Sequence, residues 1–231
     1  MISNYWQAKI FCRICYNYAM KNKYLASWGL VLLSLVLGLL AFPYLPQMVA
    51  SHWGLYGQVN GYQSRVFAVF FMPVLMAVLI ALFLALPKID PLGKNIRLFQ
   101  KAYDRFVFFL TGFLAYVHLL TLVWNLGWKF NIIRFLIPAF GIFIFGLGQI
   151  LPEARPNWFF GIRTPWTMSN GRVWYHTHEL GGKLYKLAGI IALGGFLWPS
   201  LAIYFMIIPI IAVSIYLIIF SYLDWRNEAN A

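Results

Sequence analysis

The sequence predicts an all-α protein, a polytopic membrane bundle of six transmembrane helices with both termini in the cytoplasm. First, the 231 residues are 62% hydrophobic and only 10% charged, whereas a soluble domain is about 45–50% apolar and about 25% charged. Second, six apolar runs approach or exceed the length of about 20 residues that a helix needs to cross a bilayer core. Third, Lys and Arg are spread unevenly over the connecting segments, which sets the orientation.

The six runs follow one another along the chain with short connections. They cover residues 25–44, 66–86, 106–126, 132–151, 182–200 and 201–223. Only Pro199 and Ser200 separate the last two runs. A single helix over 182–223 would extend about 63 Å at about 1.5 Å per residue, which is about twice the core thickness. We therefore expect a tight helical hairpin there and an even number of crossings.

Basic residues gather in the segments that six crossings place on one side of the membrane. The opposite side holds only Arg65, Lys129 and Arg134. Because Lys and Arg are enriched on the cytoplasmic side, both termini are expected in the cytoplasm. The formal net charge of +12 then reflects this asymmetry and the anionic lipid surface, and direct binding of nucleic acid is not expected.

The chain is expected to form one bundle over 25–223, with little soluble mass. Residues 1–24 are interpreted as a cytoplasmic interfacial segment and residues 224–231 as a cytoplasmic tail. Because the first apolar run follows about 24 residues, longer than a usual n-region, we expect an uncleaved anchor. Cys12 and Cys15 form one CxxC pair, which without a second pair is a weak metal or redox signal. No cofactor is predicted.

The third apolar run carries polar residues on one helical face: Thr111, His118, Thr121 and Asn125. A polar stripe in hydrocarbon must face the bundle interior or water. Two interpretations stay open, namely hydrogen bonding of His118 between helices and a ligand or proton pathway. No Asp or Glu lies deep in any predicted span, which weakens a proton-coupled transporter.

The predicted outer loop, residues 43–65, combines turn residues with aromatic ones. Gly54, Gly57 and the pair Asn60-Gly61 favour tight turns, since Asn-Gly tolerates positive φ angles. The candidate contact residues are His52, Trp53, Gly61 and Tyr62. The loop is expected to form a compact aromatic knob, which either anchors the chain at the membrane interface or recognises an external ligand.

The predicted inner loop, residues 152–183, begins with prolines that end the fourth helix. Pro165 favours an extended Thr164, and Ser169 or Asn170 can cap a new helix that runs from about residue 171 into the fifth span. One stripe of this helix holds Trp174, His178, Gly182, Tyr185 and Gly189.

Neither catalysis nor metal binding is expected in this loop. His176 and His178 are two residues apart and so point to different faces of a helix, which prevents them from sharing an ion. The HTHEL stretch lacks the second His of a zincin helix, and no nucleophile has an evident base partner. The alternative is a transporter or a membrane-embedded enzyme with a cytoplasm-facing site around Arg163 and His178.

A family resemblance enters at these residues. The stretch NWFFGIRTPWTMSNGRVWYHTHELGGKLYKLAG, residues 157–189, resembles the signature of the SdpI family of bacterial membrane immunity proteins. The outer stretch LPQMVASHWGLYGQVNGYQSR is similar to the N-terminal module of that family. Three positions depart from the pattern: Asn60 replaces the usual Asp, Met168 a common Leu, and Glu179 a frequent basic residue.

The resemblance implies a multi-pass protein of the bacterial plasma membrane that protects its cell from a secreted, cannibalism-type peptide toxin. It also implies a signal-transducing receptor that holds a small transcriptional repressor at the membrane. The implied partners are membrane lipids, the toxin and that repressor. In the inner motif the implied contact residues are Asn157, Arg163, Thr164, Pro165, Trp166, Trp174, His178, Gly182 and Lys183. In the outer loop they are His52, Trp53, Gly61 and Tyr62.

Overall fold

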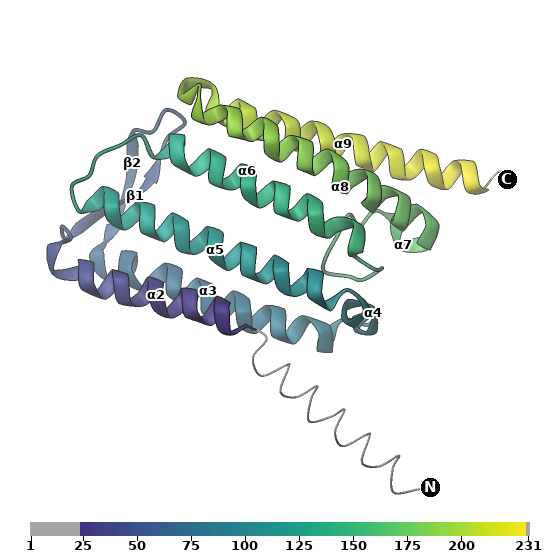
Figure 1. The fold of residues 1–231 in the computed structure, drawn as a ribbon, viewed down its shortest axis with the longest axis horizontal. Helices are drawn as coiled ribbons and strands as arrows, with labels where there is room; N and C mark the ends of the chain where they lie inside the picture. The colour runs from purple at the N-terminus through teal and green to yellow at the C-terminus, as the bar shows by residue number, and fades with distance from the viewer. Residues whose placement is uncertain (1–23, 230–231) are drawn as a thin grey trace, which may run out of the picture.

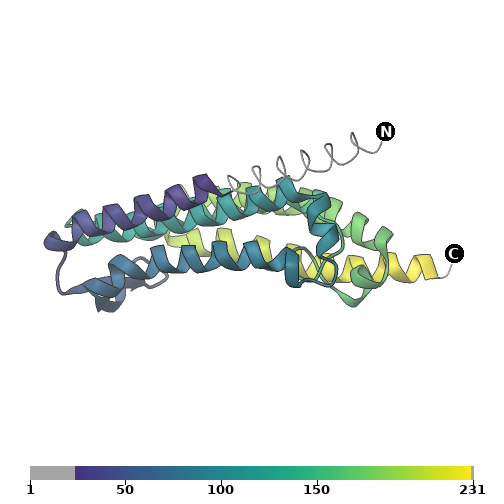
Figure 2. The same cartoon turned by 90° about the horizontal axis from the view of Figure 1, so that it is seen from below.

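Long helices lie side by side along the long axis of the molecule, with a small sheet at one end (Figure 1). The computed structural model describes residues 24–229, so Cys12, Cys15 and all but the last residue of the predicted 1–24 segment lie outside the described part. The long helices are α2 (Leu25–Ala41), α3 (Arg65–Ile89), α5 (Gln100–Asn125), α6 (Ile132–Ile150), α8 (Gly171–Leu193) and α9 (Ala202–Ala229). Turned by 90°, the bundle is elongated and shallow (Figure 2).

Five helical segments of the described chain are long and apolar enough to cross a membrane. They contain α2, α3, α5, α6 and α9. Only 6% of the residues in the most apolar stretch of the α9 segment are buried inside the protein. Large apolar surfaces of this kind are rare on soluble monomers, and a lipid environment accounts for them.

Helix α8 lies beside α6 and α9 (Figure 1), but it is not among the five candidates. Its first two thirds carry Arg172, Glu179, Lys183 and Lys186, and charged residues lower its mean hydropathy. The sixth crossing and the cytoplasmic termini therefore stay predictions.

The expectation of an all-α fold was wrong for the outer loop. Strands β1 (Met48–Trp53) and β2 (Val59–Ser64) form an antiparallel hairpin. Its turn is at Gly54–Gln58, where Gly57 has a φ of +85°. The predicted turn at Asn60-Gly61 is wrong, because both residues lie within β2 and Gly61 pairs with His52.

The connection between the last two helices also differs from the prediction. Helix α8 ends at Leu193, before the predicted end of the fifth span at residue 200, and two 3-10 turns, η3 (Gly194–Phe196) and η4 (Pro199–Leu201), lead into α9. Gly195 allows this reversal, since a Cβ there would lie 3.0 Å from the Ala202 Cα. At the other end, α9 continues to Ala229, so most of the predicted tail is helical.

Several predicted local features are confirmed. The Asn170 side chain accepts hydrogen bonds from the backbone N–H groups of Arg172 and Val173, and α8 begins at Gly171. Thr164 is extended, with φ −99° and ψ 162°, and caps a short helix, α7 (Pro165–Ser169). These caps satisfy N–H groups that have no partner within their own helix.

Candidate functional site

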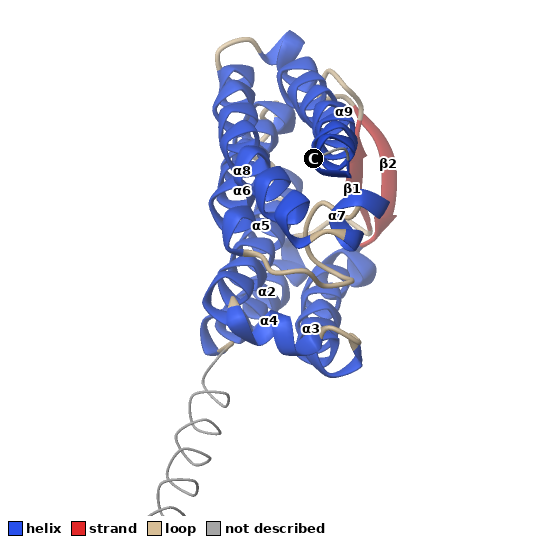
Figure 3. Cartoon of the chain, turned by 90° about the vertical axis from the view of Figure 1, so that its right-hand side faces the viewer, coloured by secondary structure: helices blue, strands red, loops and turns tan. Residues whose placement is uncertain are grey.

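Two groups of candidate residues lie at opposite ends of the bundle (Figure 1). One surrounds the β1–β2 hairpin, and we call the hollow beneath it the hairpin cavity. The other is the segment 151–170 between α6 and α8, which we call the motif loop. Seen end-on, α7 and its loops lie between α3 and α9 (Figure 3).

The hairpin cavity unites two sets of residues that the sequence presented as separate candidates. Its volume is about 280 Å³, and its lining includes His52 and Trp53 from β1 and His118 and Thr121 from α5. Residues of α3 and α6 complete the wall, among them Met72 and Leu136. Two residues of the outer loop and two of the polar stripe of the third span therefore line one cavity.

Asn125 attaches the hairpin to α5. Its side-chain oxygen accepts a hydrogen bond of 2.8 Å from the Ala50 N–H, and its side-chain nitrogen donates one of 3.0 Å to the Ala50 carbonyl. Asn125 and Ala50 are both buried. The carboxamide thus satisfies both backbone groups of Ala50, as a neighbouring strand would.

His118 is buried between α5 and α2. Its Nε2 lies 3.2 Å from the Ser34 carbonyl oxygen. A Cβ at Gly38 would lie 3.4 Å from this nitrogen and 2.9 Å from the Val69 side chain of α3. The interhelical hydrogen bond that was one interpretation of His118 is confirmed. Since a carbonyl can only accept, Nε2 carries the hydrogen and the neutral ring keeps Nδ1 as an acceptor.

Other predicted residues at this end do not line the cavity. Tyr62 is 61% exposed on β2. Gly61 packs against His52, whose Cβ would lie 2.9 Å from an added Cβ. Thr111 lies further along α5, and its hydroxyl donates to the carbonyls of its own helix. Thr111 and Gly61 therefore have structural roles in the described part of the chain.

The motif loop is organised by the buried side chain of Asn157. Its nitrogen donates to the carbonyls of Arg155 and Phe160, and its oxygen accepts from the N–H groups of Phe159 and Phe160. These four bonds use both donors and both lone pairs of the carboxamide. Asn157 thus fixes the backbone of the loop.

Two hydrogen bonds anchor the motif loop to the region after α3. The Asp90 carboxylate is buried and accepts from the Trp158 N–H at 3.0 Å. The Asn95 side chain, on the short helix α4 (Gly93–Leu98), donates to the Pro156 carbonyl at 2.7 Å. Sequence reasoning missed both residues. The only available signal was a lone Asp between two apolar runs.

His178 and Trp174 form the centre of the motif. Their rings stack with centroids 4.0 Å apart, and both side chains are almost fully buried. His178 Nδ1 lies 2.7 Å from the Trp174 carbonyl and Nε2 lies 2.9 Å from the Ile162 nitrogen. Since the carbonyl accepts and the N–H donates, the ring carries its hydrogen on Nδ1.

Burial lowers the pKa of the His178 imidazole to about 4, an effect that the hydrogen bond to the Trp174 carbonyl partly offsets. Gly161, with a φ of +116°, lets the loop approach the ring, because a Cβ there would lie 2.4 Å from His178 Nε2. Both ring nitrogens are therefore used by the fold.

Thr164 and Gly182 are also part of the packing. The Thr164 hydroxyl lies 3.1 Å from that of Ser221 on α9. A Cβ at Gly182 would lie 2.5 Å from Pro152 and 2.8 Å from the Gly148 carbonyl. Both predicted contact residues thus hold neighbouring elements together.

The exposed part of the motif loop is small and mixed in character. Arg163 and Pro165 are exposed, Trp166 is half-buried against Tyr222, and Trp158 is 51% exposed. The Arg163 guanidinium donates to the Trp158 carbonyl. Lys183 is exposed on α8 and lies 3.6 Å from Glu179. Of the predicted inner residues, only four can meet a partner readily: Arg163, Pro165, Trp166 and Lys183.

The described residues contain no group of three or more His, Cys, Asp or Glu side chains placed to hold a metal ion. His176 instead pairs with Asp224 of α9 at 3.1 Å, while Asn170 and Arg172 both contact Glu228. The first turns of α8 are thus joined to the end of α9.

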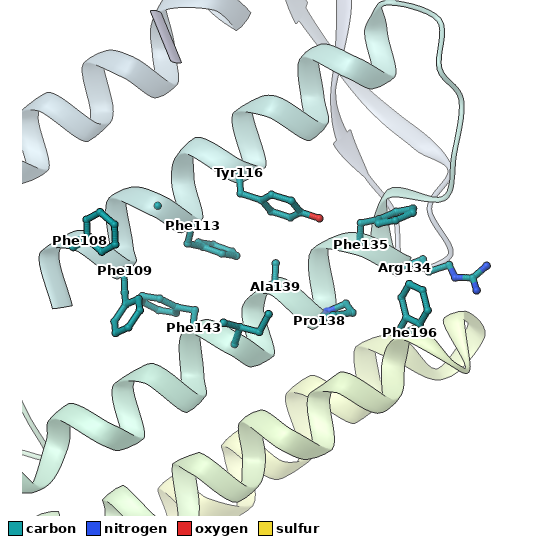
Figure 4. Close-up of a pocket in the computed structure, with 12 residues that line it drawn as sticks. Phe108, Phe109, Phe113, Tyr116, Arg134, Phe135, Pro138, Ala139, Phe143 and Phe196 are labelled. Atoms are coloured by element: carbon teal, nitrogen blue, oxygen red, sulfur yellow. The ribbon is translucent and has the colours of Figure 1, made fainter. Parts of the chain in front are cut away.

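A second hollow faces outward between α5 and α6. Its volume is about 430 Å³, and its lining is almost entirely apolar, with Phe109, Phe113 and Phe143 among the residues drawn in Figure 4. Arg134 lies at one end, with its guanidinium carbon 4.7 Å from the centre of the Phe196 ring. Within the candidate spans, such a surface suits contact with acyl chains.

Comparison with known proteins gives two regional matches and one relative. Residues 153–222 match the model described as the SdpI/YfhL protein family, and residues 29–77 match a domain of unknown function, DUF1648. The Immunity protein SdpI of Bacillus subtilis (strain 168) is 27% identical over 202 residues, which cover 87% of this chain and 95% of that protein. No solved structure matches the chain. The resemblance predicted from residues 157–189 is confirmed.

Proposed function

Because its residues 153–222 are an SdpI/YfhL family region, we propose that this chain is an immunity protein of the bacterial plasma membrane that protects its cell from a secreted peptide toxin. The observation that carries this proposal is the similarity to Immunity protein SdpI, which extends over 87% of the chain. Five apolar helices support a multi-pass membrane location.

The proposed orientation places the hairpin cavity outside and the motif loop inside. In this arrangement α8 makes the sixth crossing, although its first two thirds are polar. This orientation is supported by the distribution of basic residues. Among the described residues, the only Lys and Arg at the hairpin end are Arg65, Lys129 and Arg134, and positive charge favours the cytoplasm. The toxin then meets the chain at the hairpin.

Protection is tested by survival of a susceptible strain with and without the chain. We test a panel of secreted antimicrobial peptides and expect the chain to reduce killing by at least one of them about tenfold or more. A tenfold effect corresponds to about 1.4 kcal/mol of binding free energy between the chain and that peptide. The control is Gly148→Leu at equal expression, since a Cβ at Gly148 would already lie 2.6 Å from the Lys186 nitrogen. Equal survival against every peptide would contradict immunity.

A second role, holding a small transcriptional repressor at the membrane, is favoured by one observation. Trp158, Phe159 and Arg163 are exposed together on the motif loop. Exposed aromatic residues and Arg are the commonest anchors of protein interfaces. The candidate repressor is a small regulator encoded beside this chain.

The repressor role is tested with a fluorescently tagged copy of that regulator in the same strains. Arg163→Ala is expected to release it from the membrane while protection is retained. Lys101→Ala is the matched control, since this exposed cation is on α5 and outside the motif loop. Recruitment that is unchanged in Arg163→Ala would exclude the motif loop as the docking surface.

The alternative of an enzyme or transporter around Arg163 and His178 has less support. His178 is buried with both nitrogens hydrogen-bonded, and Arg163 donates to a carbonyl of its own loop. The relative is an immunity protein rather than a member of an enzyme family.

A further inference from the structure

We propose that the hairpin cavity binds a neutral, apolar ligand through a secondary amide, the group that an apolar peptide segment presents. Naming a peptide as the source of the amide rests on the proposed immunity function. The ligand chemistry itself rests on the cavity, and nothing in the family resemblance assigns it.

Two polar atoms of the cavity residues have no hydrogen-bond partner among the described residues. They are Nδ1 of His118 and Nε1 of Trp53, and both atoms are buried. His118 is 1% exposed. Because its Nε2 donates to Ser34, its Nδ1 is an acceptor, whereas the indole Nε1 is always a donor. Two rings that belong to the cavity lining therefore carry one acceptor and one donor without a partner.

A buried polar group without a partner costs free energy, and a ligand that pairs with it recovers this cost. A secondary amide has one N–H and one carbonyl, so its chemistry matches an acceptor and a donor. Ser51, Gln63 and Thr121 add further polar groups to the wall. A purely hydrocarbon ligand would leave the two ring nitrogens unsatisfied.

The lining excludes charged ligands. Among the described residues that line the cavity there is no Lys, Arg, Asp or Glu. A phospholipid phosphate requires a cation or several donors, and a metal ion requires more ligands than these rings supply. The remaining wall is mostly aliphatic and aromatic, which suits an apolar body.

The volume limits the size of the ligand. Small-molecule sites are usually about 300–1,000 Å³, and the hairpin cavity, at about 280 Å³, lies just below that range. It can accept one or two apolar residues rather than a folded toxin. The exposed residues His52 and Phe71 belong to its lining, so the cavity can be entered from the surface.

The site is held in place before a ligand binds. Asn125 fixes β1 at Ala50, the Trp53 ring packs edge-on against Trp124 at 5.6 Å, and Ser34 fixes the His118 ring. Little ordering is required on binding, which favours affinity for a small ligand.

The test is photo-crosslinking of the full chain, purified in detergent. The probe is a diazirine derivative of N-acetyl-leucine methyl ester, which carries one secondary amide. We expect labelling of Met72, Thr121 or Leu136. The matched N-methylated probe has no N–H, and its labelling is expected to be about fivefold lower or less, since it loses one hydrogen bond to the protein.

Variants separate the two polar contacts. His118→Phe keeps an aromatic ring but lacks the Nδ1 acceptor, and Trp53→Phe keeps an aromatic ring but lacks the donor. Both are expected to reduce labelling about fivefold. Leu136→Trp fills the cavity and is expected to abolish labelling. His176→Gln, at the motif end, is the control and is expected to label as the unaltered chain does.

Labelling that spreads over the lipid-facing helices, or that is equal for the two probes, would overturn the proposal. So would labelling that is unchanged in His118→Phe, Trp53→Phe and Leu136→Trp. The two proposals can fail separately. Protection without amide-dependent labelling would contradict only the ligand proposed for the hairpin cavity, whereas amide-dependent labelling without protection would contradict only the immunity function.

Discussion

The His178 imidazole is held neutral by its surroundings. One nitrogen accepts a hydrogen bond from Ile162 and the other donates to the Trp174 carbonyl, and the ring is buried. A second proton would face the Ile162 N–H and would carry charge into an apolar site. The neutral form is therefore part of the folded state.

Stability is expected to depend on pH through this residue. Its pKa is lowered from 6.5 to about 4 in the folded chain, so below pH 6.5 the unfolded chain binds a proton that the folded chain does not. The contribution is fully present above pH 6.5 and is lost as the pH falls to about 4, with a total of about 3 kcal/mol at about 1.36 kcal/mol per pKa unit. Thermal unfolding in detergent at pH 4 to 7 measures it.

His178→Gln is expected to be less stable at pH 7 but to lose much of the slope between pH 6.5 and 4. Gln58→Ala, on the exposed hairpin and without a titrating group, is expected to keep the slope of the unaltered chain. A His178→Gln variant with an unchanged slope would show that another group carries the pH dependence.

Individual residues were predictable where the cause is local. The Asn170 cap and the extended Thr164 depend only on neighbouring residues, and both were predicted. The cavity was not predicted, because His52 and Trp53 are more than 60 positions away from His118 in the sequence. The turn at Asn60-Gly61 was wrong since Gly57 also tolerates a positive φ and lies midway between the strands.

Helices α6 and α8 approach each other through glycines. A Cβ at Gly141 would lie 2.8 Å from the Gly189 carbonyl, and one at Gly148 would lie 2.8 Å from the Gly182 carbonyl. Each pair of glycines is seven residues apart on its own helix, so both contacts fall on one face. Close backbone approach favours helix association in membranes.

Gly182→Ala is expected to destabilise the bundle by about 1–3 kcal/mol, the range for an overpacked core, because its Cβ would collide with Pro152 and the Gly148 carbonyl. Gly29→Ala is the matched control. It lies within α2 with nothing within 4 Å of the added Cβ, and Ala favours a helix over Gly. Thermal unfolding of both variants in one detergent gives the comparison, and equal loss would contradict the glycine contact.

Five of the long helices could be predicted from apolar length, and the limits of α2, α3 and α6 lie within three residues of those expected. Helices α5 and α9 extend six residues further than predicted, and α8 ends seven residues before the predicted end of its span. The hairpin was missed because strands of six residues with mixed polarity resemble a loop. In the structure, exposed and less exposed residues alternate along β2. The short helix α7 was missed as well, although Pro165 is at its first position and Thr164 caps it.

The topology of the whole chain can be tested with single cysteines. In a background with Cys12→Ser and Cys15→Ser, the introduced substitutions are Tyr62→Cys on the hairpin, Leu197→Cys between α8 and α9, and Ser169→Cys at the motif end. All three native side chains are exposed. A membrane-impermeant maleimide on intact cells is expected to label the first two and to label the third only after permeabilisation.

Leu197→Cys decides whether α8 crosses the membrane. If α8 stays on the inner surface, position 197 is protected in intact cells and the six-span prediction is wrong. If Ser169→Cys is labelled from outside, the orientation is inverted and the proposed repressor surface faces the wrong compartment.

The paired hydrogen bonds between Asn125 and Ala50 attach the β1–β2 hairpin to one end of α5. Helix α5 has 26 residues, which corresponds to about 39 Å at about 1.5 Å per residue, and its opposite end packs through Tyr103 against Phe160. Helix α5 thus joins the β1–β2 hairpin at one end of the bundle to the motif loop at the other. A displacement of the hairpin would therefore load α5 at Asn125, and the continuous helix would transmit that strain toward Phe160.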